Sequence, residues 1–267
     1  MLFSVVAAIA ANTLSCTPVD GASRLFRDDV TWIIVGEIHG TNQTPQAFGN
    51  LVCLATRTNR AVIVAVEFSS DWQPAIDRFL ASDGGTEAQR EFLELPGWRD
   101  EFQDGRTSIA MLRLFEELRR MKQAGAVDGV VATDIGRTTP EGLHRDAAMA
   151  QAWQNISRED NAIVLALVGN IHAMRIPWSH SSGTLETAGS LMPSAQTVTV
   201  NVLSNGGEAW NCTREGCGVS RSGSKREAQP GLEFSNDPNS RWSVTYELGV
   251  PTTAALPAIQ EFAATGQ

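Results

Sequence analysis

Four short apolar runs separated by longer helical patterns constrain the fold of this chain more than any other feature. The runs are TWIIVG, AVIVAV, VDGVVAT and AIVLALV, at 31–36, 61–66, 127–133 and 162–168. Consecutive apolar positions are typical of strands buried on both faces, as in a parallel sheet covered by helices. Segments with helical patterns lie at 44–56, 73–81, 86–94, 107–124 and 139–155. The alternation predicts a single α/β domain with a mostly parallel central sheet flanked by helices on both faces.

Details of the later segments refine this prediction. The segment 107–124 has the apolar spacing of an amphipathic helix. The segment 139–155 opens with a threonine and a proline, a capping residue followed by the residue favoured at the first helical position. Two further strands are expected at 197–203 and 241–248, and the alternating pattern of the second predicts an edge strand.

A long Gly/Ser-rich stretch at 204–240 interrupts this pattern and contains two of the four cysteines. A loop of that length without secondary structure is expected to be stapled, functional or disordered. A Cys212–Cys217 disulfide would pin it and would suit an oxidising compartment. Zinc binding is less favoured, because no second cysteine pair and no histidine lies nearby. Cys53, inside a predicted helix, is expected to be a small buried apolar residue.

The N-terminal 22 residues are expected to form a leader, and 23–267 the folded domain. The apolar run at 2–11 is too short to span a bilayer but suits the core of a secretory signal. Two alternatives are a lipoprotein leader with a lipid anchor on Cys16 and a mildly apolar N-terminal segment of a cytosolic protein. No later segment reaches 18 uninterrupted apolar residues, so no transmembrane segment is expected. The favoured location is the periplasm or cell envelope.

Acids and histidines stand where the four apolar runs end. The first run leads into Glu37 and His39, the second ends at Glu67, the third at Asp134, and the fourth leads into His172. Ligands of open α/β sheets bind beyond the carboxyl ends of the strands. One acid or histidine at such a position commonly caps a helix or fixes a loop. Four strand ends of this kind on one edge predict a functional site, because gathered charges repel and desolvate one another.

Three further residues are candidates for substrate contact or support. Arg145 and Asp146 lie in the last predicted helix, and Asn170 lies just after the fourth strand. Arg145 could pair with the carboxylates, clamp an anionic substrate group, or form a surface pair on its own helix. His144 and His180 have no supporting pattern and are expected to be solvated or structural.

The charge balance narrows the class of partner. The chain has 30 acidic and 21 basic residues, a net charge of −9. Nucleic-acid binding requires clustered cations that neutralise phosphates, so this composition argues against it. A small molecule is the expected partner.

Four short motifs occur in order and carry a family resemblance. They are G-E-x-H-G at 36–40, V-E at 66–67, R-D-x-x-M-A at 145–150 and G-N-x-H-A at 169–173. Together they resemble the superfamily that groups erythromycin esterases, ChaN-type haem-uptake lipoproteins and the TIKI/TraB proteins. The resemblance covers just over half of the chain. It implies an α/β fold with a cleft lined by Glu37, His39, Glu67, Arg145 and His172, and it implies hydrolysis, metal-dependent peptide cleavage or haem binding according to the branch.

The leading hypothesis is a hydrolase that cleaves an ester, a lactone or an amide. His39 or His172 would act as general base on a water molecule, because imidazole titrates near neutral pH. Glu37 and Glu67 would orient the imidazoles or share a proton, and Arg145 would stabilise the developing oxyanion. No G-x-S-x-G motif is present, which disfavours a serine nucleophile.

Two alternatives involve a cofactor. Glu37, His39, Glu67 and His172 are ligand types that suit Zn²⁺ or Mn²⁺ with one position open to water. The other alternative is an envelope protein that binds haem without catalysis. Tyr246 is the single tyrosine of the chain, and so the one candidate for a tyrosine ligand to haem.

Overall fold

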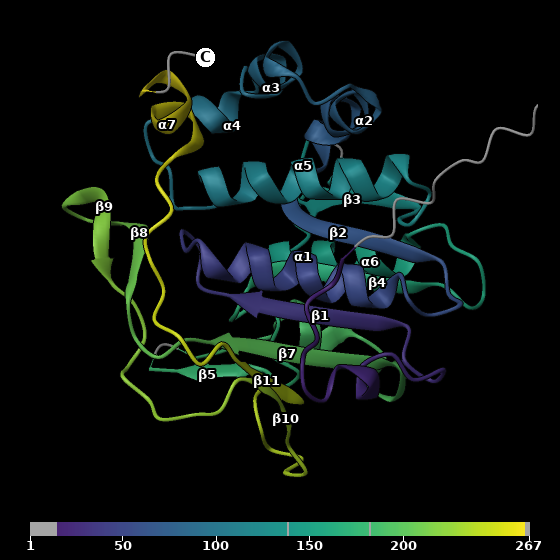
Figure 1. Ribbon diagram of the computed structural model, residues 1–267. Coiled ribbons are helices and arrows are strands. Elements are labelled where there is room, and N and C mark those ends of the chain that lie inside the picture. Colours follow the sequence, from purple (N-terminus) through teal and green to yellow (C-terminus); the bar gives the residue numbers. More distant parts are fainter. Residues whose placement is uncertain (1–14, 138, 182, 265–267) are drawn as a thin grey trace, which may run out of the picture.

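A seven-stranded sheet forms the centre of the molecule (Figure 1). The computed structural model describes residues 15–137, 139–181 and 183–264. The strand order in these residues is β10-β11-β7-β1-β4-β2-β3, and every neighbouring pair is parallel except β10 and β11. The predicted mostly parallel α/β sheet is therefore confirmed. The strands are β1 (Trp32–Glu37), β2 (Val62–Ser69), β3 (Gly129–Asp134), β4 (Ile163–Gly169), β7 (Thr197–Leu203), β10 (Gly231–Phe234) and β11 (Val244–Glu247).

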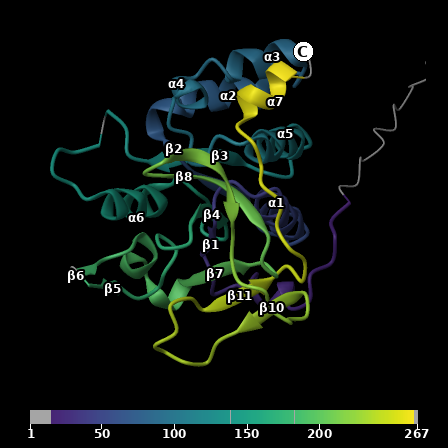
Figure 2. The ribbon, with the colours of Figure 1, turned by 90° about the vertical axis from the view of Figure 1, so that its left-hand side faces the viewer.

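Helices cover both faces of this sheet, with α6 on one face and α1, α2 and α5 on the other (Figure 2). Phe48 and Phe115 are buried in the core on the side of α1 and α5, and Trp153 in the core on the side of α6. Burial of a large apolar side chain contributes about 1.5–3 kcal/mol, so these two cores hold the layers together. The helices are α1 (Gln43–Ala55), α2 (Gln73–Ala81), α3 (Thr86–Phe92), α4 (Pro96–Arg99), α5 (Ile109–Gln123), α6 (Arg145–Asn155) and α7 (Ala258–Ala264).

Two predicted boundaries are wrong for local reasons. The helix expected from residue 139 begins only at Arg145, because the preceding residues form a turn in which Gly142 has a φ of 81°. The segment 241–248 contains β11, which is an interior strand between β10 and β7, so the edge on that side is β10.

The Gly/Ser-rich stretch 204–240 is largely ordered. It contains the antiparallel hairpin β8 (Glu208–Thr213) and β9 (Gly216–Arg221), followed by the edge strand β10. The predicted disulfide is present, and it joins Cys212 to Cys217 directly across the hairpin. Figure 2 shows β8 in front of the carboxyl ends of the central strands. The second short hairpin pairs β5 (Trp178–His180) with β6 (Gly183–Leu185).

The N-terminal cysteine corrects two expectations. Cys16 and Cys53 form a disulfide, so Cys53 is not simply a small buried apolar residue. A lipid on Cys16 would need the sulfur that this disulfide uses, so the structure does not support a lipid anchor there. Ala22 and Leu25 are buried, so the chain from 16 onward packs on the domain. The rest of the expected leader, residues 1–14, lies outside the described residues.

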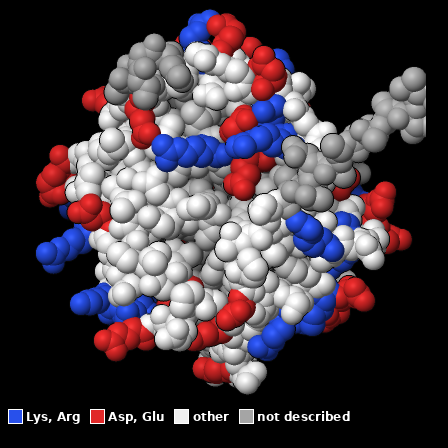
Figure 3. Space-filling model, viewed as in Figure 1, with Lys and Arg blue, Asp and Glu red and all other residues white. Residues whose placement is uncertain are grey.

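Two features of the described residues bear on the surroundings of the protein. No helix among them is long and apolar enough to cross a membrane. Basic and acidic side chains lie side by side on the face shown in Figure 3.

Candidate functional site

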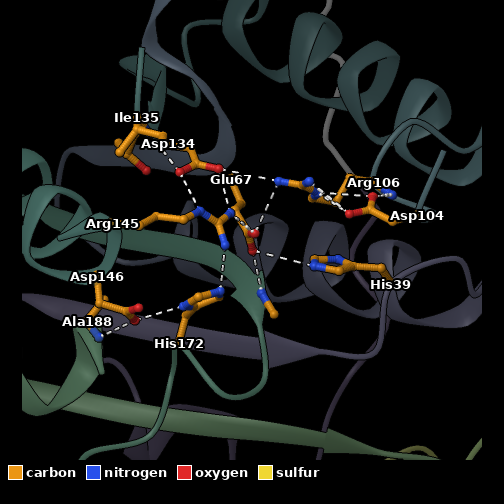
Figure 4. Close-up of polar contacts among 12 residues, drawn as sticks. His39, Glu67, Asp104, Arg106, Asp134, Ile135, Arg145, Asp146, His172 and Ala188 are labelled. Carbon is orange, nitrogen blue, oxygen red and sulfur yellow. Dashed lines mark hydrogen bonds and ion pairs between the residues drawn. The ribbon is translucent and has the colours of Figure 1, made fainter. Parts of the chain in front are cut away.

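The residues predicted at the strand ends converge at the carboxyl edge of the sheet (Figure 4). The register of the sheet explains this, because Glu37 at the end of β1 stands directly beside Gly169 at the end of β4. A cavity of about 380 Å³ lies at this edge. The predicted residues that line it are Glu37, His39, Glu67, Arg145, Asn170 and His172.

His39 lies between two buried carboxylates. Its Nδ1 donates a hydrogen bond to Glu37 Oε1 at 2.9 Å, and its Nε2 lies 3.6 Å from Glu67 Oε2. Burial alone would lower the pKa of His39, but the charges of Glu67 and Glu37 outweigh it and raise this pKa to about 9. His39 is therefore a protonated imidazolium at neutral pH.

The two glutamates are held in different ways. Glu67 Oε2 accepts a hydrogen bond from the Gly169 backbone N–H at 2.6 Å, and Glu67 Oε1 pairs with Arg145. Burial opposes ionisation of Glu67, but His39, Arg145 and other cationic groups lower its pKa to about 2. Burial raises the pKa of Glu37 above its ordinary value, against the hydrogen bond from His39. Its second oxygen, Oε2, is buried and has no hydrogen-bond partner among the described residues.

Arg145 joins three of the predicted residues. It is the first residue of α6, and its Nε donates to Asp134 Oδ1 at 2.8 Å while Nη2 pairs with both Asp134 and Glu67. Its Nη1 lies 2.8 Å from His172 Nε2. Four of its five N–H groups thus contact Asp134, Glu67 and His172, so the protein itself holds the guanidinium in place.

The partners of His172 define its tautomer. Guanidinium cannot accept a hydrogen bond, so Arg145 must donate to His172 Nε2 and that nitrogen carries no proton. His172 Nδ1 then carries the proton and donates it to Asp146 Oδ1 at 2.7 Å. Asp146 also accepts from the Ala188 backbone N–H at 2.8 Å, which fixes its carboxylate. Burial opposes ionisation of Asp146, but the hydrogen bond from His172 and other favourable contacts lower its pKa.

Asp104 and Arg106 complete the charge cluster, and the sequence interpretation missed them. Arg106 Nε donates to both carboxylate oxygens of Asp104 at 3.1 and 3.0 Å. Its Nη1 lies 3.3 Å from Asp134 and 3.5 Å from Glu67. The two residues flank Gly105, which has a φ of 94°, in an irregular segment before α5. The only signal was this acid-glycine-arginine turn, which is too common to indicate a site.

Glycines allow the hairpin β8–β9 to close over the site. The Gly40 carbonyl accepts a hydrogen bond from the Trp210 backbone N–H at 2.8 Å. Gly40 has a φ of 74°, and a Cβ there would lie 1.9 Å from the Trp210 carbonyl oxygen. This approach brings Asn211 of β8 to the cavity wall, with its Oδ1 buried and without a partner among the described residues. The sequence interpretation missed Asn211 because only tertiary packing places it there.

Glycine also leaves the floor of the cavity open. A Cβ on Gly169 would lie 3.1 Å from His39 Nε2 and 3.5 Å from His172 Cδ2. Both imidazoles therefore lie close to the place where a side chain on residue 169 would begin. Asn170 contributes to this floor through its backbone, since its N–H donates to the Glu37 carbonyl at 2.8 Å and its carbonyl accepts from Trp242 at 3.0 Å.

The geometry does not fit the metal that the residue types suggested. Within the described ranges, no group of three or more His, Cys, Asp or Glu side chains is arranged to hold a metal ion. Glu67 and His172, two of the suggested metal ligands, instead contact the guanidinium of Arg145, which also pairs with Asp134. This guanidinium supplies the positive charge that a metal ion would otherwise supply.

The haem alternative has no support in the placement of its candidate tyrosine ligand. Tyr246 is only 8% exposed and packs in the apolar core on β11, away from the cavity. The nearby histidine nitrogens are engaged by Glu37, Asp146 and Arg145, with His39 Nε2 facing Glu67.

Comparison with known proteins identifies the fold. No protein-family model and no curated protein sequence matches the chain. An erythromycin esterase mutant in its open conformation is similar in structure, with a TM-score of 0.59 and 10% identity over 88% of this chain and 92% of that one. A succinoglycan biosynthesis protein gives a TM-score of 0.58 and 9% identity over 88% and 91% of the two chains. A bacterial protein toxin gives a TM-score of 0.46 and 20% identity over 71% of this chain, which spans just 37% of the toxin chain. The chain thus has the fold of the erythromycin esterase that its motifs resemble.

Proposed function

We propose that this chain is an exported hydrolase that cleaves an ester, lactone or amide with a water molecule, without a metal. The observation that carries the proposal is the contrast between two histidines that face one cavity. His39 is an imidazolium paired with carboxylates, and His172 is a neutral imidazole whose unprotonated Nε2 is oriented by Asp146. An acid and a base that line the same cavity suit general acid–base catalysis.

In the proposed reaction, water attacks the carbonyl carbon and gives a proton to His172 Nε2. The Arg145 Nη1–H, which donates to this nitrogen in the resting protein, turns to the oxyanion that forms on the carbonyl oxygen. The bond to the leaving oxygen or nitrogen then breaks, and His39 Nε2–H protonates that atom. The products are a carboxylic acid and an alcohol or amine, and solvent returns the proton from His172 to His39.

The surrounding carboxylates hold these groups in place before substrate arrives. Asp134 and Glu67 fix the guanidinium of Arg145, and Glu37 and Glu67 fix the imidazolium of His39. Prearranged charges need no reorganisation during the reaction, which is the main source of electrostatic catalysis. The fold shared with an erythromycin esterase is compatible with such chemistry.

Export is supported by the cysteines. All four are paired, as Cys16–Cys53 and Cys212–Cys217, and the described residues contain no free cysteine. Disulfides persist in oxidising compartments such as the periplasm.

The test is hydrolysis of a panel of 4-nitrophenyl esters, lactones and anilides by the purified chain after dialysis against a chelator. His39→Gln and His172→Gln should each lower kcat/KM by about 10²–10⁴-fold, the usual contribution of a general acid or base. His180→Gln is the matched control, because His180 lies on β5 and does not line the cavity. Turnover that survives in both site variants, or that requires added metal, would contradict the proposal.

A further inference from the structure

A second cavity adjoins the one that the two histidines line. It has a volume of about 290 Å³ and shares Glu67, Asp104 and Arg106 with the 380 Å³ cavity. An apolar cavity of about 150 Å³ is large enough to hold benzene, so the second cavity has room for a ring. Because the two cavities have lining residues in common, a molecule whose reactive bond lies near the histidines can extend a substituent into the second one.

The charged side chains between the two cavities are already paired with one another. Arg106 holds Asp104, and Arg145 pairs with Glu67. Asp134, which also lines the second cavity, pairs with the same Arg145. These pairs balance their own charges, so the remaining walls of the second cavity decide which substituent it favours.

The apolar part of these walls is aromatic. Phe68, Trp72 and Phe102 line the second cavity, and the ring centroids of Phe68 and Trp72 lie 5.0 Å apart. A Cβ on Gly97 would lie 2.3 Å from the Trp72 ring, so glycine allows this ring to pack closely on α4. The Trp72 ring is thus fixed before a ligand binds, which lowers the cost of ordering it on binding.

Phe102 is the exposed member of this wall. Its side chain is 65% exposed, the largest exposed fraction among the large apolar side chains of the described residues. A single exposed apolar residue is ordinary on a protein surface, but Phe102 lines a cavity that continues into the proposed site. Aromatic rings gain from stacked or edge-to-face contact beyond the gain from burial. The walls therefore favour an aromatic substituent over an aliphatic one.

We infer that the second cavity is a specificity subsite that binds an aromatic ring of the substrate, with Trp72 and Phe102 as the residues that recognise it. The inference rests on the proposed function in taking the first cavity as the place of the reaction. It narrows the substrate to an ester, lactone or amide that carries an aromatic group close to the bond to be cleaved.

The first experiment measures binding without catalysis. Ligand-observed NMR titrations compare 2-phenylethanol with 1-hexanol, in which a butyl group replaces the phenyl ring. Wild type should bind 2-phenylethanol about three- to tenfold more tightly, the range that an aromatic contact adds to burial. Phe102→Leu keeps an apolar side chain but should remove most of this preference, whereas Phe102→Tyr should keep it. Val250→Ala is the matched control, because Val250 is also an exposed apolar residue but lines neither cavity.

A further variant tests Trp72 without removing it. Gly97→Ala should also lower the preference for 2-phenylethanol, because the new Cβ displaces the Trp72 ring. Equal binding of the two alcohols by wild type, or an unchanged preference in Phe102→Leu or Gly97→Ala, would overturn the inference. Sedimentation velocity checks one other explanation of the exposed ring. A wild-type dimer that Phe102→Leu dissociates would overturn the inference, since a second copy would then cover Phe102.

The second experiment measures hydrolysis of two ester pairs in which butyl again replaces phenyl. One pair is 2-phenylethyl acetate and hexyl acetate, and the other is ethyl 3-phenylpropanoate and ethyl heptanoate. Wild type should prefer the phenyl member of one pair by about three- to tenfold in kcat/KM, which assigns the subsite to the alcohol or the acyl part, and Phe102→Leu should lose this preference. Hydrolysis without a preference in either pair would overturn the inference. Phe102-dependent binding of 2-phenylethanol without hydrolysis of any ester would instead overturn the proposed function and leave the aromatic subsite standing.

Discussion

Raising the pH through 9 should destabilise this protein through one side chain, His39. Its pKa is about 9 in the folded protein, against an ordinary value of 6.5 in an unfolded chain. Because the folded value is the higher one, the stabilisation is complete below pH 6.5 and is lost as the pH rises through 9. The two values correspond to about 2.5 kcal/mol at pH 7 and almost nothing at pH 10. His39 has a side-chain exposure of 21%, so solvent screens this interaction only in part.

Few other groups in the chain lose a proton in the same range. The sequence contains two lysines and one tyrosine, and all four cysteines are in disulfides. Urea unfolding of wild type at pH 7 and pH 10 should therefore show a loss of about 2.5 kcal/mol. His39→Gln should begin less stable and show almost no further loss, while the control His180→Gln should behave as wild type.

The same titration predicts the alkaline limit of catalysis. If His39 is the general acid, kcat/KM should fall above about pH 9 as its proton is lost. A free-enzyme rate that rises toward pH 9 would instead make His39 the base. Equal losses of stability in wild type and His39→Gln would refute the argument that the two carboxylates hold a charged imidazolium.

Three further changes test the supports of the site. Arg145→Gln leaves Glu67 and Asp134 without their shared cation and should lower the free energy of unfolding in urea by about 3–5 kcal/mol. Adding Asp134→Asn should recover part of this loss, and strictly additive losses from the two substitutions would contradict the ion-pair account. Replacing Cys16 and Cys53 by serine opens a loop with a sequence separation of 37 and should lower the free energy of unfolding by about 4 kcal/mol through chain entropy. This loss should appear as a lower Tm, and an unchanged Tm would argue against the disulfide. Gly40→Ala places a Cβ 1.9 Å from the Trp210 carbonyl oxygen at a residue with positive φ, so it should lower the free energy of unfolding by at least about 1–3 kcal/mol. The hairpin β8–β9 should then be cleaved more readily by proteases, and a variant as resistant to proteolysis as wild type would contradict this packing.

The sheet and the polar residues at its carboxyl edge were predictable because both depend on local pattern. Continuous apolar runs identify buried parallel strands, and the polar residue that follows each run must lie at the carboxyl edge. Glu37, Glu67, Asp134 and His172 were found in this way, and the structure brings them together. Periodicity needs no knowledge of tertiary contacts, which is why it succeeded here.

The residues that the sequence interpretation missed owe their positions to long-range contacts. Asp104 and Arg106 lie in an irregular segment, and Asn211 lies on a hairpin whose strand β8 follows the last central strand of the site by about forty residues. None follows a periodic run, so nothing local distinguishes them from ordinary loop residues. The Cys16–Cys53 disulfide was also missed, because Cys16 lies in a segment whose sequence resembles a leader.

The sequence left the roles of the two histidines open, whereas their long-range contacts in the structure distinguish them. His39 and His172 each follow a strand and a glycine, so the sequence treats them alike. In the structure, His39 faces two carboxylates and must carry a charge, whereas His172 faces one carboxylate and one guanidinium and must carry a single proton. The difference follows from Arg145, which occupies one nitrogen of His172 and none of His39. The contrast between the two imidazoles therefore requires this arginine as much as it requires the histidines.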